Sequence, residues 1–463
     1  MQQERHLDAS APPLARVEAF EEPDYRQQLD RRLSLRHLVV YGMIAIVPIA
    51  PMAVYGFVSR ESYGMVPLVY AVGIIAMLFT ALSYKQMSSA FPFAGSVYSY
   101  VQRGLHPYAG FIAGWMILAD YLLTPALIYT FSASWLRGVL PAVPTWAWVL
   151  VFAIVNTSIN VLGIRIQAKM HLLLLALELI ALAVFLVLAI DFVFVARHGV
   201  GGWSMAPFWQ PAHWNGGFIA AATSIAVLSF LGFDAISTLA EETRNPRTTV
   251  GNATVLVLLL LGAIFIVETY VAALAHPNYR ILDAELGFFQ IAREIGGQGL
   301  YVALIVINVV AAGIANALAA QAAISRILFS MGRDRVLPGA TFLSRVHPRL
   351  RTPVNAILLV AVLSVALALL IPGEALIKLV NFGALTAFML LNITVFVFFF
   401  VKRKQRAHFF RYAVFPALGL AIVAFVWSGF DRITFLFGGM WLLAGLILGA
   451  FKYRNSVPFE VQP

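Results

Sequence analysis

Long apolar runs separated by short polar connections recur along almost the whole chain. A helix of about 20 apolar residues crosses the hydrocarbon core of a bilayer, which is roughly 30 Å thick. Each run is long enough for such a crossing, and none shows the alternation of a half-buried strand. The pattern predicts an all-α integral membrane protein with twelve transmembrane helices, at about residues 37–58, 65–90, 108–136, 146–163, 168–195, 217–240, 250–274, 299–330, 354–371, 375–401, 411–429 and 433–451.

The polar connections leave no room for a separate soluble domain of ordinary size. A basic turn at 402–406 separates the first ten spans from a final pair. We therefore predict a transport core at 37–401 and two additional helices within 411–452. Polar tails of the chain are expected at 1–36 and 453–463.

Two of the predicted helices contain residues that break a helix. The first contains Pro48 and Pro51, each of which removes a backbone donor. The sixth contains Gly232. Interrupted helices at matching positions of two halves are typical of transporters built from inverted repeats, whose substrate site lies between the halves. We predict such repeats at about 37–195 and 217–401.

Composition and charge agree with a membrane protein. The chain is 61% hydrophobic and 12% charged, whereas a soluble domain carries roughly 25% charged residues. Most of the 32 Lys and Arg residues lie in alternate connections, and the rule that basic loops stay inside places both termini in the cytoplasm. The same loops account for the net charge of +10, so we expect no nucleic-acid partner.

The sequence offers little for covalent or metal chemistry. It contains no cysteine, which excludes disulfides and thiolate ligands. No paired metal-ligand motif and no Ser-His-acid arrangement supported by spacing is present. We expect no metal, no cofactor and no enzymatic activity.

Acidic side chains within the predicted spans are candidates for the functional site, because a charge at the bilayer centre costs roughly 2.5–3.5 kcal/mol and usually faces the protein interior. Asp234 follows the sixth-span break and could bind substrate, carry a proton or cap the broken helix. Asp120 could hold an ammonium group or bond to a freed amide. Glu178 could carry a proton or bond to a neighbouring span.

These considerations give one set of site residues. Phe230 stands out among the aromatic residues, because a ring beside the break could contact a cation. Proton coupling is assigned to Asp234 and Glu178. The predicted substrate-binding residues are Ala45, Pro48, Ile49, Asp120, Ser229, Phe230, Gly232 and Asp234.

Several motifs resemble the amino acid–polyamine–organocation superfamily of permeases, most of all its putrescine-importer branch. They are FLGFDAISTLAEETRNP from residue 230, AGSVYSY at 94–100, ADYLLTPA at 119–126, ISRILFSMGRDRVLP at 324–338 and NFGALTAF at 381–388. The resemblance runs from about residue 33 to 453. It implies a leucine-transporter-like fold, alternating access, and uptake driven by protons more often than by sodium. One departure is Ala53, where the resembled importers carry an aspartate.

We therefore expect a proton-coupled importer of putrescine or a related polyamine, in the inner membrane of a bacterium. A proton-coupled amino-acid permease, or an exchanger of amino acids and amines, is the alternative. A dication needs two separated carboxylates, whereas the carboxylate of an amino acid can bind at the N-termini of broken helices. A channel would use similar features, but it would not show saturable uptake and exchange. The expected partners are the solute, protons and the lipid bilayer.

Overall fold

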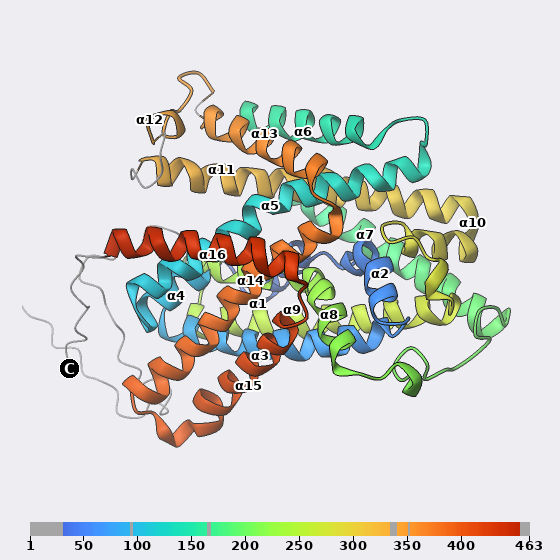
Figure 1. Cartoon of the computed structure of the whole chain (residues 1–463), viewed down its shortest axis with the longest axis horizontal. Coiled ribbons are helices and arrows are strands. Elements are labelled where there is room, and N and C mark those ends of the chain that lie inside the picture. Colours follow the sequence, from blue (N-terminus) through green and yellow to red (C-terminus); the bar gives the residue numbers. More distant parts are fainter. Residues whose placement is uncertain (1–30, 93–95, 164–167, 334–339, 351, 454–463) are drawn as a thin grey trace, which may run out of the picture.

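The computed structural model describes residues 31–92, 96–163, 168–333, 340–350 and 352–453. The predicted tails at 1–36 and 453–463 lie largely outside these ranges. Within them the regular structure is helical, apart from one isolated bridge between Leu33 and Thr243. The long helices lie side by side and run roughly along the longest axis of the molecule (Figure 1).

Apolar helices make up the bundle, with shorter 3-10 and π segments where they bend or break. Their regular α-helical parts are α1 (Leu35–Ile46), α2 (Ala50–Glu61), α3 (Val66–Ala90), α4 (Ser96–Gly104), α5 (Pro107–Val139), α6 (Thr145–Leu162), α7 (Ala168–Ile190), α8 (Gly216–Ala226), α9 (Pro246–Ala275), α10 (Gly287–Asn308), α11 (Ala317–Arg333), α12 (Ala340–Leu343), α13 (Val354–Leu370), α14 (Gly373–Val395), α15 (Phe415–Trp427) and α16 (Arg432–Tyr453).

Ten helical stretches of the described chain are long and apolar enough to cross a membrane. The bent pair α1 and α2, with an angle of 46°, passes the same test as one broken span. The remaining apolar run forms the shorter helix α13. The helical, membrane-spanning class is confirmed, while the count of twelve crossings and the inverted repeat stay predictions.

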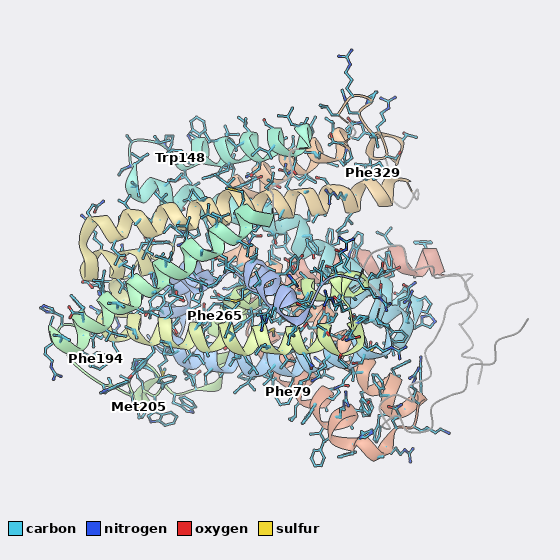
Figure 2. All side chains as sticks on the ribbon, turned by 180° about the vertical axis from the view of Figure 1, so that it is seen from behind. Phe79, Trp148, Phe194, Met205, Phe265 and Phe329 are labelled. Atoms are coloured by element: carbon cyan, nitrogen blue, oxygen red, sulfur yellow. The ribbon has the colours of Figure 1, made fainter. Side chains whose placement is uncertain are left out.

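Apolar side chains fill the interior and also cover the outside of the bundle. Phe265 of α9 lies inside and is fully buried, whereas Met205 and Trp148 lie at the periphery (Figure 2). On α6 and α7, Ile154 and Ile180 are among many large apolar side chains that are exposed. Helices that are apolar on every face are typical of a lipid environment. The charged groups inside this bundle therefore need a specific explanation.

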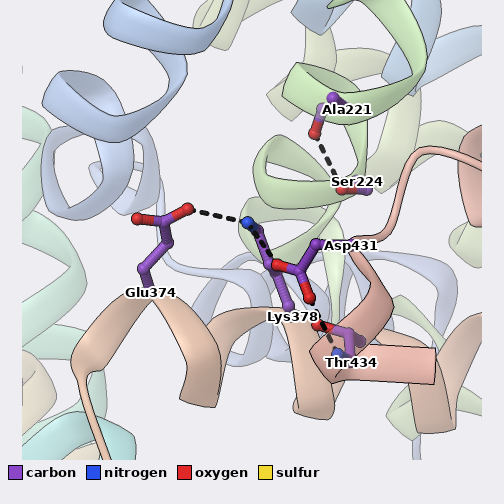
Figure 3. A network of polar contacts seen from close by, with 6 residues as sticks. All are labelled: Ala221, Ser224, Glu374, Lys378, Asp431 and Thr434. Atoms are coloured by element: carbon purple, nitrogen blue, oxygen red, sulfur yellow. Dashed lines mark hydrogen bonds and ion pairs between the residues drawn. The ribbon is translucent and has the colours of Figure 1, made fainter. Parts of the chain in front are cut away.

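A polar network joins the final helix to the core (Figure 3). The Lys378 ammonium on α14 donates to Glu374 Oε1 at 2.7 Å and to Asp431 Oδ2 at 2.8 Å. The backbone N–H of Thr434, in the first turn of α16, donates to Asp431 Oδ1 at 2.8 Å. Partial burial would raise the pKa of Asp431, but the hydrogen bonds from Lys378 and Thr434 and the charge of Lys378 lower it. Asp431 therefore stays ionised and ties α16 to α14.

Asp431→Asn is expected to lower thermal stability by on the order of 1 kcal/mol, because the network is partly exposed to solvent. A carboxylate whose pKa is lowered by folding contributes its stability at neutral pH and loses it as the pH falls through that lowered value. The difference in the free energy of unfolding between the variant and the wild type should stay constant from about pH 8 to 5, and it should become smaller only below about pH 4. Thermal unfolding in detergent measures it, with the exposed Asp191→Asn as control. Equal stabilities at pH 7 would contradict this role.

Candidate functional site

The first break separates α1 from α2. Val47 has φ 70° and ψ 110°, and a positive φ is a genuine outlier for a β-branched residue. Pro48 follows without a backbone donor, and Pro51 stands in the first turn of α2. The chain is therefore held out of helical geometry at this point, and backbone groups near the end of α1 have no place in an α-helical ladder.

The second break lies between α8 and the 3-10 helix η5 (Phe233–Glu242). A short 3-10 segment, η4 (Val227–Phe230), follows α8, and Leu231 is then extended. Gly232 has φ 110° and ψ −16°, a conformation that glycine adopts readily. The following ten residues wind as a 3-10 helix instead of an α-helix. A 3-10 stretch of this length is uncommon and often marks a hinge.

The two breaks meet. A Cβ built on Gly232 would lie 2.7 Å from the carbonyl oxygen of Ala45. One on Gly42 would lie 2.6 Å from Cδ1 of Ile236. α1 packs against η5, and α2 packs against α8. The broken spans therefore cross at their interruptions, and glycine is required there both for its φ and for the close approach.

Two carboxyl groups lie near this crossing. The hydroxyl of Ser96 donates to Asp234 Oδ2 at 3.3 Å. The hydroxyl of Thr124 donates to Asp120 Oδ1 at 3.0 Å. The two acids are close enough for an electrostatic interaction between them, so the fold brings together two of the three acids that the sequence analysis named. Paired carboxyls in an apolar interior can hold a cation or share a proton.

Aromatic rings enclose the Asp234 side of the crossing. Tyr84 makes edge contacts with Phe233 at 5.5 Å and with Phe388 at 6.1 Å between ring centroids. Tyr100 packs against Tyr84 at 5.9 Å. Such rings exclude water, and their faces attract cations.

Three other predicted residues are packed within the bundle. Ser229 is buried, and its Oγ is 2.8 Å from the Tyr70 hydroxyl. The fully buried ring of Phe230 lies 5.8 Å from that of Tyr70 and 5.3 Å from that of Phe265. Ile49 is also fully buried. In this conformation Phe230 packs against α3 and α9 beside the breaks.

Glu178 lies apart from the acidic pair. It is buried on α7, which packs mainly against α10. Within the described ranges it makes no hydrogen bond to Asp120 or Asp234. Nor do the His, Asp and Glu side chains of these ranges form a group of three that could hold a metal ion.

Sequence reasoning missed Glu268, a further acid inside the bundle. It lies in the apolar run IFIVETYVAAL of α9 and is 0% exposed. In the part of the chain that the structure describes, both of its carboxyl oxygens lack a hydrogen-bond partner. The signal that identified Asp120 and Glu178, an acid within an apolar run, applied equally to this position.

Asn381 of α14 is a second residue that the sequence analysis did not assign. Its side-chain amide donates to the carbonyl oxygens of Ser224 at 2.7 Å and of Ile225 at 3.3 Å. These carbonyls lie at the end of α8, where an α-helix leaves its acceptors unpaired. Asn381 therefore stabilises the second break, although only its place in the NFGALTAF motif pointed to it.

The chain is similar to known permeases over most of its length. The family model for amino acid permeases matches residues 37–455. The low-affinity putrescine importer PlaP of Escherichia coli K12 is 32% identical over 446 residues, which cover 94% of this chain and 96% of the importer. The branched-chain amino acid permease BcaP of Bacillus subtilis is 28% identical over 91% of this chain and 93% of its own length. Mouse cationic amino acid transporter 4 is 27% identical over 84% of this chain and 63% of its own.

These relatives are membrane transporters and not enzymes, and two of them match over nearly their whole length. The helical bundle and its broken spans fit the same class. The chain belongs to the amino acid permease family, within the amino acid–polyamine–organocation superfamily of membrane transporters.

Proposed function

We propose that this permease imports a small amine-bearing solute, putrescine or a related polyamine, by proton-coupled alternating access. The observation that carries the proposal is the pair Asp120 and Asp234 at the crossing of the two breaks. A carboxyl pair in a water-poor site binds an ammonium group more readily than a neutral solute. The similarity to a putrescine importer over 94% of the chain supports the same solute class.

The proposed architecture has twelve spans, with inverted repeats at about 37–195 and 217–401 and two further helices within 411–452. Both termini then lie in the cytoplasm of a bacterium, with the protein in its inner membrane. In this orientation α1 and η5 form the inner halves of the broken spans, and α2 and α8 form the outer halves. Rocking one repeat against the other would open the crossing to each side in turn.

The helix ends at the crossing would act on the solute through their dipoles. α1 ends at Ile46 and η4 at Phe230, and the C-terminal end of a helix carries partial negative charge. An ammonium group beside Asp234 is stabilised by the C-terminal ends of both α1 and η4. α2 and η5 begin at the same crossing, and their N-terminal ends favour an anion.

An amino-acid substrate is the second candidate, and three observations favour it. The N-terminal ends of α2 and η5 could hold a carboxylate without any arginine. The chain is also similar to BcaP, a branched-chain amino acid permease, and Ala53 lacks the carboxylate that the resembled putrescine importers carry. An amino acid would place its ammonium group at Asp234 and its carboxylate at these helix ends.

Uptake into proteoliposomes decides between these solutes. With an inward pH gradient, labelled putrescine should accumulate, saturate with concentration and exchange for internal putrescine. The pure protein should also be stabilised thermally by about 2.7 kcal/mol at a hundredfold excess over Kd. Accumulation of leucine or lysine without putrescine would instead support the amino-acid reading. Non-saturable flux would indicate a channel, and accumulation without any pH gradient would remove the proton from the mechanism.

A further inference from the structure

Glu268 is the most deeply buried acid of the bundle that the proposed site does not use. It is 0% exposed, and neither carboxyl oxygen has a hydrogen-bond partner among the described residues. An ionised carboxylate without partners in an apolar interior costs far more free energy than protonation does. Glu268 therefore holds a proton in this conformation.

Two tyrosines interact with Glu268. Tyr55 of α2 and Tyr70 of α3 both interact with it electrostatically and with each other. None of the charged or histidine side chains described on the elements packed against α9 forms a hydrogen bond with Glu268. The basic and histidine residues on these elements are Arg36, His37, Arg60, Lys85, His171 and Arg293, and the acids are Glu61, Glu178, Asp191, Asp234, Glu241, Glu242 and Glu294.

A small pocket reaches the same tyrosine from the end of the bundle where α2 and α9 finish. Its volume is about 40 Å³, and its lining includes Tyr55, Ser59, Ala273 and His276. A cavity needs about 10–15 Å³ to hold one water molecule, so this pocket has room for water. In the proposed orientation it opens on the outer side.

A hydroxyl pair leads from Tyr70 toward the second break. The Tyr70 hydroxyl is 2.8 Å from Ser229 Oγ, and Ser229 lies three residues before Gly232. Tyr55 thus lines the pocket, Tyr70 reaches the break through Ser229, and Glu268 interacts with both tyrosines. Every member between the pocket and the break can pass or hold a proton.

We propose that Glu268 is the outer proton-binding residue of the transporter, loaded from the water pocket through the Tyr55 hydroxyl and coupled to the second break through Tyr70 and Ser229. This inference rests on the proposed proton-coupled function. A hydronium ion in the pocket gives a proton to the Tyr55 hydroxyl oxygen and becomes water, as that hydroxyl passes its own proton to the Glu268 carboxylate. A proton needs no added volume here, whereas an ammonium group would have to displace packed side chains.

Chemical labelling tests the bound proton without relying on transport. Dicyclohexylcarbodiimide attacks protonated carboxyls in apolar surroundings, and mass spectrometry locates the adduct. We expect an adduct on Glu268 of the wild-type protein in liposomes and none on Glu61, which is exposed at the end of α2. Labelling of Glu178 without labelling of Glu268 would overturn the proposal.

Transport by variants then tests the coupling. Glu268→Gln should reduce pH-driven accumulation of putrescine to the external concentration while exchange of internal for external putrescine continues. Tyr55→Phe should slow pH-driven uptake, and Glu61→Gln should behave as the wild type.

Undiminished accumulation by Glu268→Gln would refute the role of Glu268 in proton binding. Loss of exchange together with loss of accumulation would place Glu268 in solute binding instead. If the wild type accumulates no amine or amino acid, the proposed function fails, while the adduct still reports on the proton at Glu268.

Discussion

Replacing Gly232 with alanine is expected to lower solute uptake by about ten-fold or more while leaving the protein inserted in the membrane. The residue has φ 110°, where a side chain costs about 1–3 kcal/mol of backbone strain. Its new Cβ would also lie 2.7 Å from the carbonyl oxygen of Ala45, which belongs to backbone and cannot rotate away. Each 1.4 kcal/mol is about ten-fold in a population, so a strained break should lower uptake by at least that factor.

Gly439→Ala is the matched control for this variant. Gly439 lies in α16, and a Cβ there meets nothing within 4 Å, so uptake should stay at the wild-type level. Initial rates in proteoliposomes, corrected for the amount of reconstituted protein, measure both variants. Normal uptake by Gly232→Ala would mean that the close contact of the two breaks has no part in transport.

Asp234→Asn is expected to remove concentrative uptake. Asparagine keeps the shape of the side chain and can still accept a hydrogen bond from Ser96, but it carries no charge and takes up no proton. Hydrogen bonds to charged groups contribute about 1.5–3 kcal/mol. The affinity for an amine should therefore fall by about 10- to 150-fold, and a pH gradient should no longer drive accumulation.

Asp191→Asn separates this effect from a general loss of charge, because Asp191 is exposed at the end of α7. Its uptake should equal that of the wild type. A second comparison is Asp120→Asn, which keeps Asp234 and should weaken amine binding without removing the response to pH. Concentrative uptake by Asp234→Asn would exclude this residue from both solute binding and proton coupling.

Variants of Asp234 and Glu268 are also expected to differ in their effects, because the two acids occupy different positions. Asp234 follows the second break and interacts with Asp120. Glu268 is connected to the residues before that break through Tyr70 and Ser229. Loss of solute binding is expected only on the Asp234 side, whereas loss of coupling is expected on both.

The order of residues alone determined the class of this protein and the places where its helices break. Insertion into a bilayer depends on the length and polarity of local segments, so apolar runs and their interruptions can be read without knowing the fold. Proline and glycine act within one turn of the helix, which is why Pro48 and Gly232 were informative. The cost of a buried charge is also local, and it pointed to Asp120 and Asp234.

The tertiary structure decided which of these features meet. Ala45 and Gly232 lie almost 190 residues apart in sequence but share one contact, and nothing local specifies that pairing. The packing of Phe230 against Tyr70 and Phe265 depends on how α3 and α9 approach the break. Glu268 is distinctive because both of its oxygens lack hydrogen-bond partners within the described ranges, and hydrogen bonding depends on neighbours that helix packing supplies. Composition and periodicity act along the chain, whereas a site is made by contacts between helices remote in sequence.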